Sequence, residues 1–170
     1  ERFYQYYDQD LFKRSRLFTG VFFDAEHWNK TAMVRGRRAG WGWEVHDPQT
    51  LASGAPMSDQ GRKDLIRLFT VKRDYLAGKS RDEKIAFLTH TSYDTYLKGT
   101  VGVGKEVVEL LRAQPHALWG VGTDALSALE MVRMNFPGFD GMELGHVPGT
   151  EEDEEPYIFH FPDGNASIAR

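Results

Sequence analysis

Short apolar stripes at helical spacing, each closed off by glycine or proline, run through the middle of this 170-residue chain. Ser58 is placed to cap a helix with a buried stripe of Leu65, Ile66, Phe69 and Leu76, ending at Gly78. Ser80-Arg81-Asp82-Glu83 forms a capping box that opens a second helix. Three further segments follow, at 92–97, 104–115 and 123–134, with Thr123 as the expected cap of the last. Residues 58–135 are therefore predicted to form a helical array.

Strand patterns are expected toward the two ends of the chain. Residues 17–24 and 156–161 are short apolar runs bounded by turn residues, and 32–34 is a third candidate. The first and last of these strands are placed to share a sheet. Residues 3–14 repeat aromatic side chains at helical spacing, whereas the Gly- and Pro-rich stretch 36–56 and residues 137–155 are expected to be loops. The predicted fold class is α+β, mainly helical with a few short strands near the two ends.

Composition excludes several classes of function. The chain has no cysteine, which removes disulfides, thiolate nucleophiles and cysteine metal ligands. A net charge of -4 gives no support to nucleic-acid binding, which favours a basic face. No apolar run approaches the roughly 20 residues of a membrane span. None of this separates a cytoplasmic from a periplasmic location.

The familiar catalytic and cofactor motifs lack their structural context. Residues 120–125 match the dinucleotide fingerprint GxGxxG/A, but the preceding residues 115–119 are predicted to be an inter-helix loop rather than a strand. We interpret these glycines as a tight turn before a capped helix. The six histidines are scattered singly and form no zinc pattern, and the serines lack a GxSxG setting.

Two features are suited to a cationic ligand. Residues 151–155 are five consecutive acids, a solvated loop that also attracts positive charge. Trp41 and Trp43 flank a glycine, and tryptophan faces attract ammonium groups. Core packing or a subunit contact is the other use of such an aromatic pair.

The chain begins at Glu1, without an initiator methionine, and a turn at 162–165 introduces a helix that the last residues are too few to complete. We therefore expect a segment of a larger protein. Read in order, six stretches resemble flavin-dependent amine oxidase-like oxidoreductases, and within them the spermidine dehydrogenase-like bacterial branch. These stretches are 6–12, 20–24, 91–97, 122–129, 136–142 and 160–170.

The resemblance implies that residues 1–170 are one substrate-binding, cap-like region of an FAD-dependent protein. An FAD-binding domain elsewhere in the same chain would hold the flavin, and the isolated segment would neither bind FAD tightly nor turn over substrate. Trp41, Trp43, Tyr93 and Tyr96 are the implied aromatic walls of the substrate pocket, with packing as the other duty of the two tyrosines. The turn residues Asp163, Gly164 and Asn165 are the implied flavin contacts.

The function expected from this resemblance is binding of an amine, including a polyamine, for oxidation by the flavin. No catalytic residue and no metal ligand is assigned to the segment itself. One alternative is a non-catalytic helical interaction or assembly module, which predicts a closed core with a polar surface all round. Another is the substrate region of a flavoprotein that acts on an apolar substrate, which predicts an apolar tunnel without carboxylates.

Overall fold

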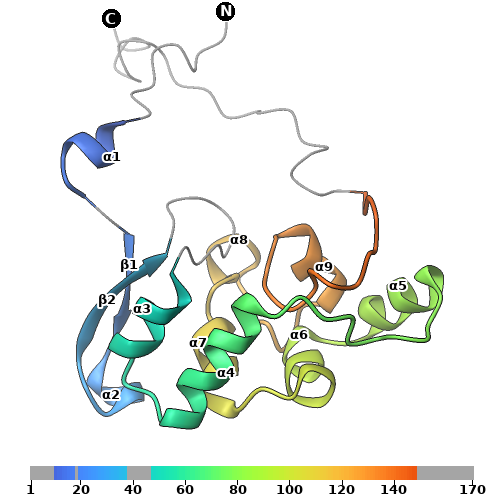
Figure 1. Cartoon of the computed structure of the whole chain (residues 1–170), viewed down its shortest axis with the longest axis horizontal. Coiled ribbons are helices and arrows are strands. Elements are labelled where there is room, and N and C mark those ends of the chain that lie inside the picture. The colour runs from blue at the N-terminus through green and yellow to red at the C-terminus, as the bar shows by residue number, and fades with distance from the viewer. Residues whose placement is uncertain (1–9, 18, 38–46, 149–170) are drawn as a thin grey trace, which may run out of the picture.

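Helices dominate the computed structural model of the chain, which describes residues 10–17, 19–37 and 47–148. A two-stranded antiparallel sheet lies near the N-terminus, and helices from α3 onward follow it along the chain (Figure 1). The predicted α+β class is therefore confirmed. Within the described residues, no helix is long and apolar enough to cross a membrane.

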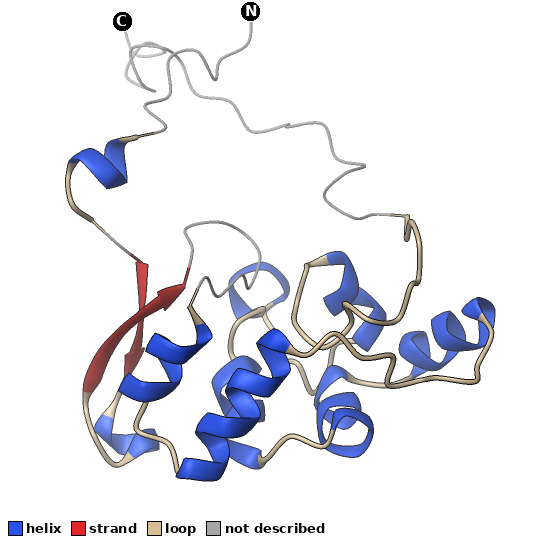
Figure 2. Cartoon of the chain, in the orientation of Figure 1, coloured by secondary structure: helices blue, strands red, loops and turns tan. Residues whose placement is uncertain are grey.

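The sheet is a hairpin of β1 (Thr19–Phe23) and β2 (Ala32–Arg37) (Figure 2). Strand β1 confirms the expectation for residues 17–24, and β2 extends the candidate at 32–34. Phe23 and Val34 are buried on the inner face, whereas the cross-strand partners Phe22 and Met33 are exposed. This alternation is what a sheet with one covered face requires. The expected strand at 156–161, and any pairing with β1, lies outside the described residues.

The connection between the two strands contains a short helix, α2 (Ala25–Trp28). Asp24 is its N-cap and accepts a hydrogen bond from the backbone N–H of His27 at 2.8 Å. Asn29 ends the helix with a left-handed φ of 59°, a conformation that asparagine tolerates better than most residues. Before the hairpin, α1 (Leu11–Arg14) is the described part of the helix expected at 3–14.

The expectation of a continuous loop over 36–56 is wrong at its end. Helix α3 (Pro48–Gly54) begins there, with Asp47 as N-cap and Pro48 in the first turn. Leu51 and Ala52 are buried, and the helix packs against β2. The many glycines and prolines obscured this helix, because Pro48 starts it and Gly54 is its last residue.

The helical array predicted for 58–135 is present, with shorter members than expected. Its members are α4 (Asp59–Thr70), α5 (Arg81–His90), α6 (Tyr93–Tyr96), a π-helical turn (Leu97–Val101), α7 (Lys105–Arg112), α8 (His116–Trp119) and α9 (Ala128–Arg133). The caps Ser58 and Ser80 are confirmed, the latter with both bonds of the capping box. Helix α4 ends at Thr70 rather than Gly78, and Leu76 is buried from the connection that follows.

The expected cap of the last helix is also wrong. Ser127, not Thr123, caps α9 through the backbone N–H of Glu130. Thr123 is fully buried, and its hydroxyl donates to Asp94 at 2.5 Å. Thr123 thus serves a tertiary contact, and the helix begins only at Ala128.

Candidate functional site

A cavity of about 450 Å³ lies where the α2 turn meets the start of α7. Its lining combines two segments far apart in the chain, 26–29 and 105–109, with Pro56 between them. The carboxylates on its wall are Glu26, Glu106 and Glu109, and the cationic groups are Lys105 and His27, which is paired with Asp24. The three carboxylates outnumber these two cationic groups and give the cavity a negative potential.

Glu106 is the most firmly held of these carboxylates. Its Oε1 accepts from the backbone N–H of Ser58 at 2.9 Å, and its Oε2 accepts from the Ser58 hydroxyl. A side chain on Gly61 would collide with Oε2, so glycine at this position leaves the room that the Glu106 carboxylate occupies. Glu106 is thus a structural acid that also contributes its charge to the cavity.

Glu26 and Glu109 are the more accessible acids. Both are exposed, and Glu109 lies 3.5 Å from the Arg112 guanidinium, in the next turn of α7. Such an exposed ion pair contributes little to stability and leaves the carboxylate able to exchange partners. These two side chains can therefore meet a ligand without loss of a buried contact.

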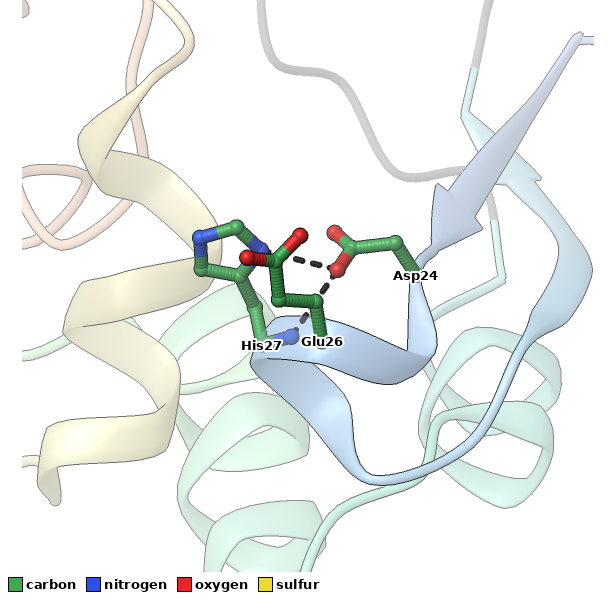
Figure 3. Close-up of side chains that lie close together, drawn as sticks. All are labelled: Asp24, Glu26 and His27. Carbon is green, nitrogen blue, oxygen red and sulfur yellow. Dashed lines mark hydrogen bonds and ion pairs between the residues drawn. The ribbon is translucent and has the colours of Figure 1, made fainter.

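His27 and Trp28 supply the aromatic part of the wall. Trp28 packs edge-on against the buried Phe23, with ring centroids 5.1 Å apart at 90°. The His27 Nδ1 lies 2.8 Å from Asp24 Oδ1, and Figure 3 shows Glu26 beside this pair. The hydrogen bond to Asp24 raises the pKa of His27 and lowers the pKa of Asp24. The two groups therefore favour the ion-paired form.

Asp24, Glu26 and His27 together offer three ligand atoms within 4.8 Å of one another. In the sequence His27 is one of six scattered histidines, and its grouping with Asp24 and Glu26 was not predicted. The available signal was the local run Asp-Ala-Glu-His, in which an N-cap and the third helical residue face each other. The acids of α7 gave no such signal, because only the tertiary fold brings them to α2.

The predicted tyrosine walls lie elsewhere. Tyr93 and Tyr96 are both 0% exposed; in the core Tyr96 stacks on Phe139, and Tyr93 packs edge-on against Phe136. The Tyr93 hydroxyl donates to the carbonyl of Pro137 at 2.7 Å, and that of Tyr96 donates to the carbonyl of Gly138 at 2.6 Å. Burial raises the pKa of both hydroxyls. In this arrangement the rings pack the interior, and neither belongs to the lining of the cavity.

The remaining predicted site residues lie outside the described part of the chain. These are Trp41, Trp43, Asp163, Gly164 and Asn165. The acidic run 151–155 lies outside it as well.

The glycine-rich turn at 120–125 does not fit an FAD pyrophosphate. Helix α8 precedes it where the fingerprint needs a strand, and Gly120 ends that helix with a φ of 68°. Thr123 faces the buried Asp94 rather than an open cradle. Comparison with known protein families and with curated protein sequences finds no match for the chain.

Proposed function

We propose that this chain binds a small organic amine in the cavity between α2 and α7, as the substrate-binding region of an FAD-dependent oxidoreductase. The observation that carries the proposal is the composition of the cavity wall. Three carboxylates, one lysine and the Trp28 ring surround a space of about 450 Å³. That volume is within the range of small-molecule sites.

An alkylammonium ligand matches both halves of this wall. Its charged nitrogen is attracted to Glu26 and Glu109 at the open side, and its methylene groups find apolar contact on Trp28. Because these acids are exposed, solvent and salt screen the attraction. We therefore expect modest, salt-sensitive binding that increases with the number of positive charges on the ligand.

The flavin part of the proposal rests on the resemblance described above. FAD would supply the redox chemistry, and it would be held by another domain of the parent protein. The described residues contribute binding and orientation of the amine only. The FAD-binding domain is thus the proposed partner of this region.

Two observations weigh against the alternatives. A flavoprotein for apolar substrates would need a tunnel without carboxylates, whereas this cavity carries three. A self-contained module would have a polar surface, whereas Phe22 and Met33 lie side by side on the outer sheet face, 60% and 65% exposed. The first observation favours an amine over an apolar substrate, and the second provides an apolar face for contact with the proposed FAD-binding domain.

Titration calorimetry with spermidine tests the proposal. We expect saturable binding, no comparable heat from the uncharged 1,8-octanediol, and weaker binding as salt is raised from about 0.05 to about 0.5 M. The double variant Glu26→Gln/Glu109→Gln should weaken binding by about tenfold or more, since two charges next to the ligand are removed. The control Asp82→Asn/Asp140→Asn removes two acids outside the cavity lining and should keep the wild-type affinity. Equal affinities in the two double variants would refute the proposal.

A further inference from the structure

We propose that Asp24, Glu26 and His27 form a binding site for a divalent first-row transition metal ion, with Zn²⁺ as its probe. Their three ligand atoms lie within 4.8 Å of one another at the start of α2. This site goes beyond amine binding. It shares Glu26 and His27 with the cavity lining, whereas Asp24 lies outside that lining and distinguishes the two sites.

The geometry of the Asp24–His27 pair already suits a shared ion. Ligand atoms about 2.1 Å from one metal lie about 3.0–3.4 Å apart. The His27 Nδ1 and Asp24 Oδ1 are 2.8 Å apart, so a small rotation admits an ion between them in place of the proton. Both hydrogen bonds from His27 go to Oδ1, which leaves Oδ2 of Asp24 as a further ligand atom.

The Glu26 carboxylate completes the set. It lies beside the imidazole in Figure 3, and its side chain is exposed, so a rotamer change is enough to bring an oxygen to the ion. The resulting set is one imidazole nitrogen and two carboxylates. That combination suits Zn²⁺ and its neighbours better than Ca²⁺ or Mg²⁺, which prefer oxygen ligands alone.

The backbone of the turn is held in place on both sides of the ligands. Phe23 and Trp28, which flank the run, pack edge to face, and Phe23 is fully buried. Asp24 is fixed as the cap of α2, and Asn29 ends that helix. A ligand set on an anchored turn loses less conformational freedom when the ion binds.

The local charge also favours a cation. Glu106 and Glu109 of α7 line the same cavity as Glu26 and His27, and the nearby cations are Lys105 and the Arg112 partner of Glu109. Their negative potential raises the local concentration of a divalent ion. Three protein ligands leave coordination positions open to water or to a second ligand, as in catalytic rather than structural zinc sites.

Calorimetric titration of the untagged chain with ZnCl₂ tests this site. We expect one saturable site whose dissociation constant rises at least about tenfold in His27→Ala and in Asp24→Asn. Asparagine still caps a helix, so Asp24→Asn removes a charged ligand and keeps the fold of α2. His116→Ala, which removes an exposed histidine on α8, is the matched control and should bind Zn²⁺ as the wild type does.

A second readout locates the ion. Crystals grown with Zn²⁺ should show an anomalous peak between the side chains of Asp24 and His27. Zn²⁺ affinity unchanged by His27→Ala, or an anomalous peak only at other residues, would overturn the proposal. Asp24→Asn separates this site from the amine site, because Asp24 lies outside the cavity lining: it should weaken Zn²⁺ binding and keep the wild-type affinity for spermidine.

Discussion

The hydroxyl groups of the two core tyrosines hold the loop at Pro137 and Gly138 in place. Tyr93 and Tyr96 come from one short helix, and each donates to a backbone carbonyl of the Pro137–Gly138 turn. Pro137 and Gly138 belong to no helix or strand. The side-chain hydroxyls therefore take the place of secondary structure.

Replacing Tyr93 by phenylalanine should destabilise the protein by about 1–3 kcal/mol, because the buried Pro137 carbonyl loses its donor while the ring stays. Chemical denaturation measures this loss. The half-buried Tyr75 is the control, and Tyr75→Phe should cost less. If the ring packs the core and borders no ligand, spermidine affinity at a temperature where the variant is folded should be unchanged. A large fall in affinity would instead support Tyr93 as a substrate wall.

At the scale of elements, α7 is joined to α4 by the Glu106 carboxylate. This acid bonds the N-cap residue Ser58, and the absence of a side chain on Gly61 makes room for it. The same contact brings the first turn of α7 to one wall of the cavity. The glycine thus serves the tertiary contact at the expense of helix propensity.

Gly61→Ala should destabilise the protein, although alanine is the better helix former. The added methyl group would displace Glu106 and break its bonds to Ser58, each worth about 1 kcal/mol. In a Glu106→Ala background the same substitution should be stabilising, by about 0.5–1 kcal/mol. The double-mutant cycle is measured by urea unfolding. If Gly61→Ala changed the free energy of unfolding equally in both backgrounds, the close contact between position 61 and the Glu106 carboxylate would be contradicted.

A second link between elements is the ion pair of Asp74 and Lys84, which ties the connection after α4 to α5 at 2.7 Å. The hydrogen bond from Lys84 lowers the pKa of Asp74 below its ordinary value. A lowered pKa in the folded state means that the stabilisation is present above the unfolded value and is lost as pH falls through the folded one.

We therefore expect Asp74→Asn to lower the thermal midpoint near pH 7 and to have less effect as pH is taken below about 4. Asparagine keeps an acceptor for the Leu76 backbone N–H, so the charge alone is tested. The exposed Asp82→Asn is the control on α5. A difference between wild type and variant that stays constant from neutral to acid pH would show that the ion pair contributes nothing.

Local patterns were enough to predict most caps and failed where a tertiary contact intervened. Ser58 and Ser80 cap their helices through residues three positions away, so the sequence alone carries the signal. Thr123 has the same local appearance but bonds Asp94 from another element, and Ser127 takes over the cap. The predicted length of α4 erred for a similar reason, since Leu76 keeps the apolar period without being helical.

At the scale of the whole molecule, the cavity joins the N-terminal hairpin to the helical array. The α2 turn lies at the sheet end of the molecule and α5 at the opposite end (Figure 1). The α+β class followed from periodicity, which is a local property. The cavity could not be predicted from periodicity, because its acids belong to α2 and α7 and come together only in the folded chain.

Binding of an amine between α2 and α7 is tested by NMR of the backbone amide groups during a titration with spermidine. Saturable shifts should concentrate on residues 26–29 and 105–109, which line the cavity, and should be reduced in Glu26→Gln/Glu109→Gln. Residues of α5 around Asp82, which are acidic and exposed, serve as the internal reference and should shift little. Shifts spread evenly over the exposed acids, without saturation at the cavity, would contradict the account.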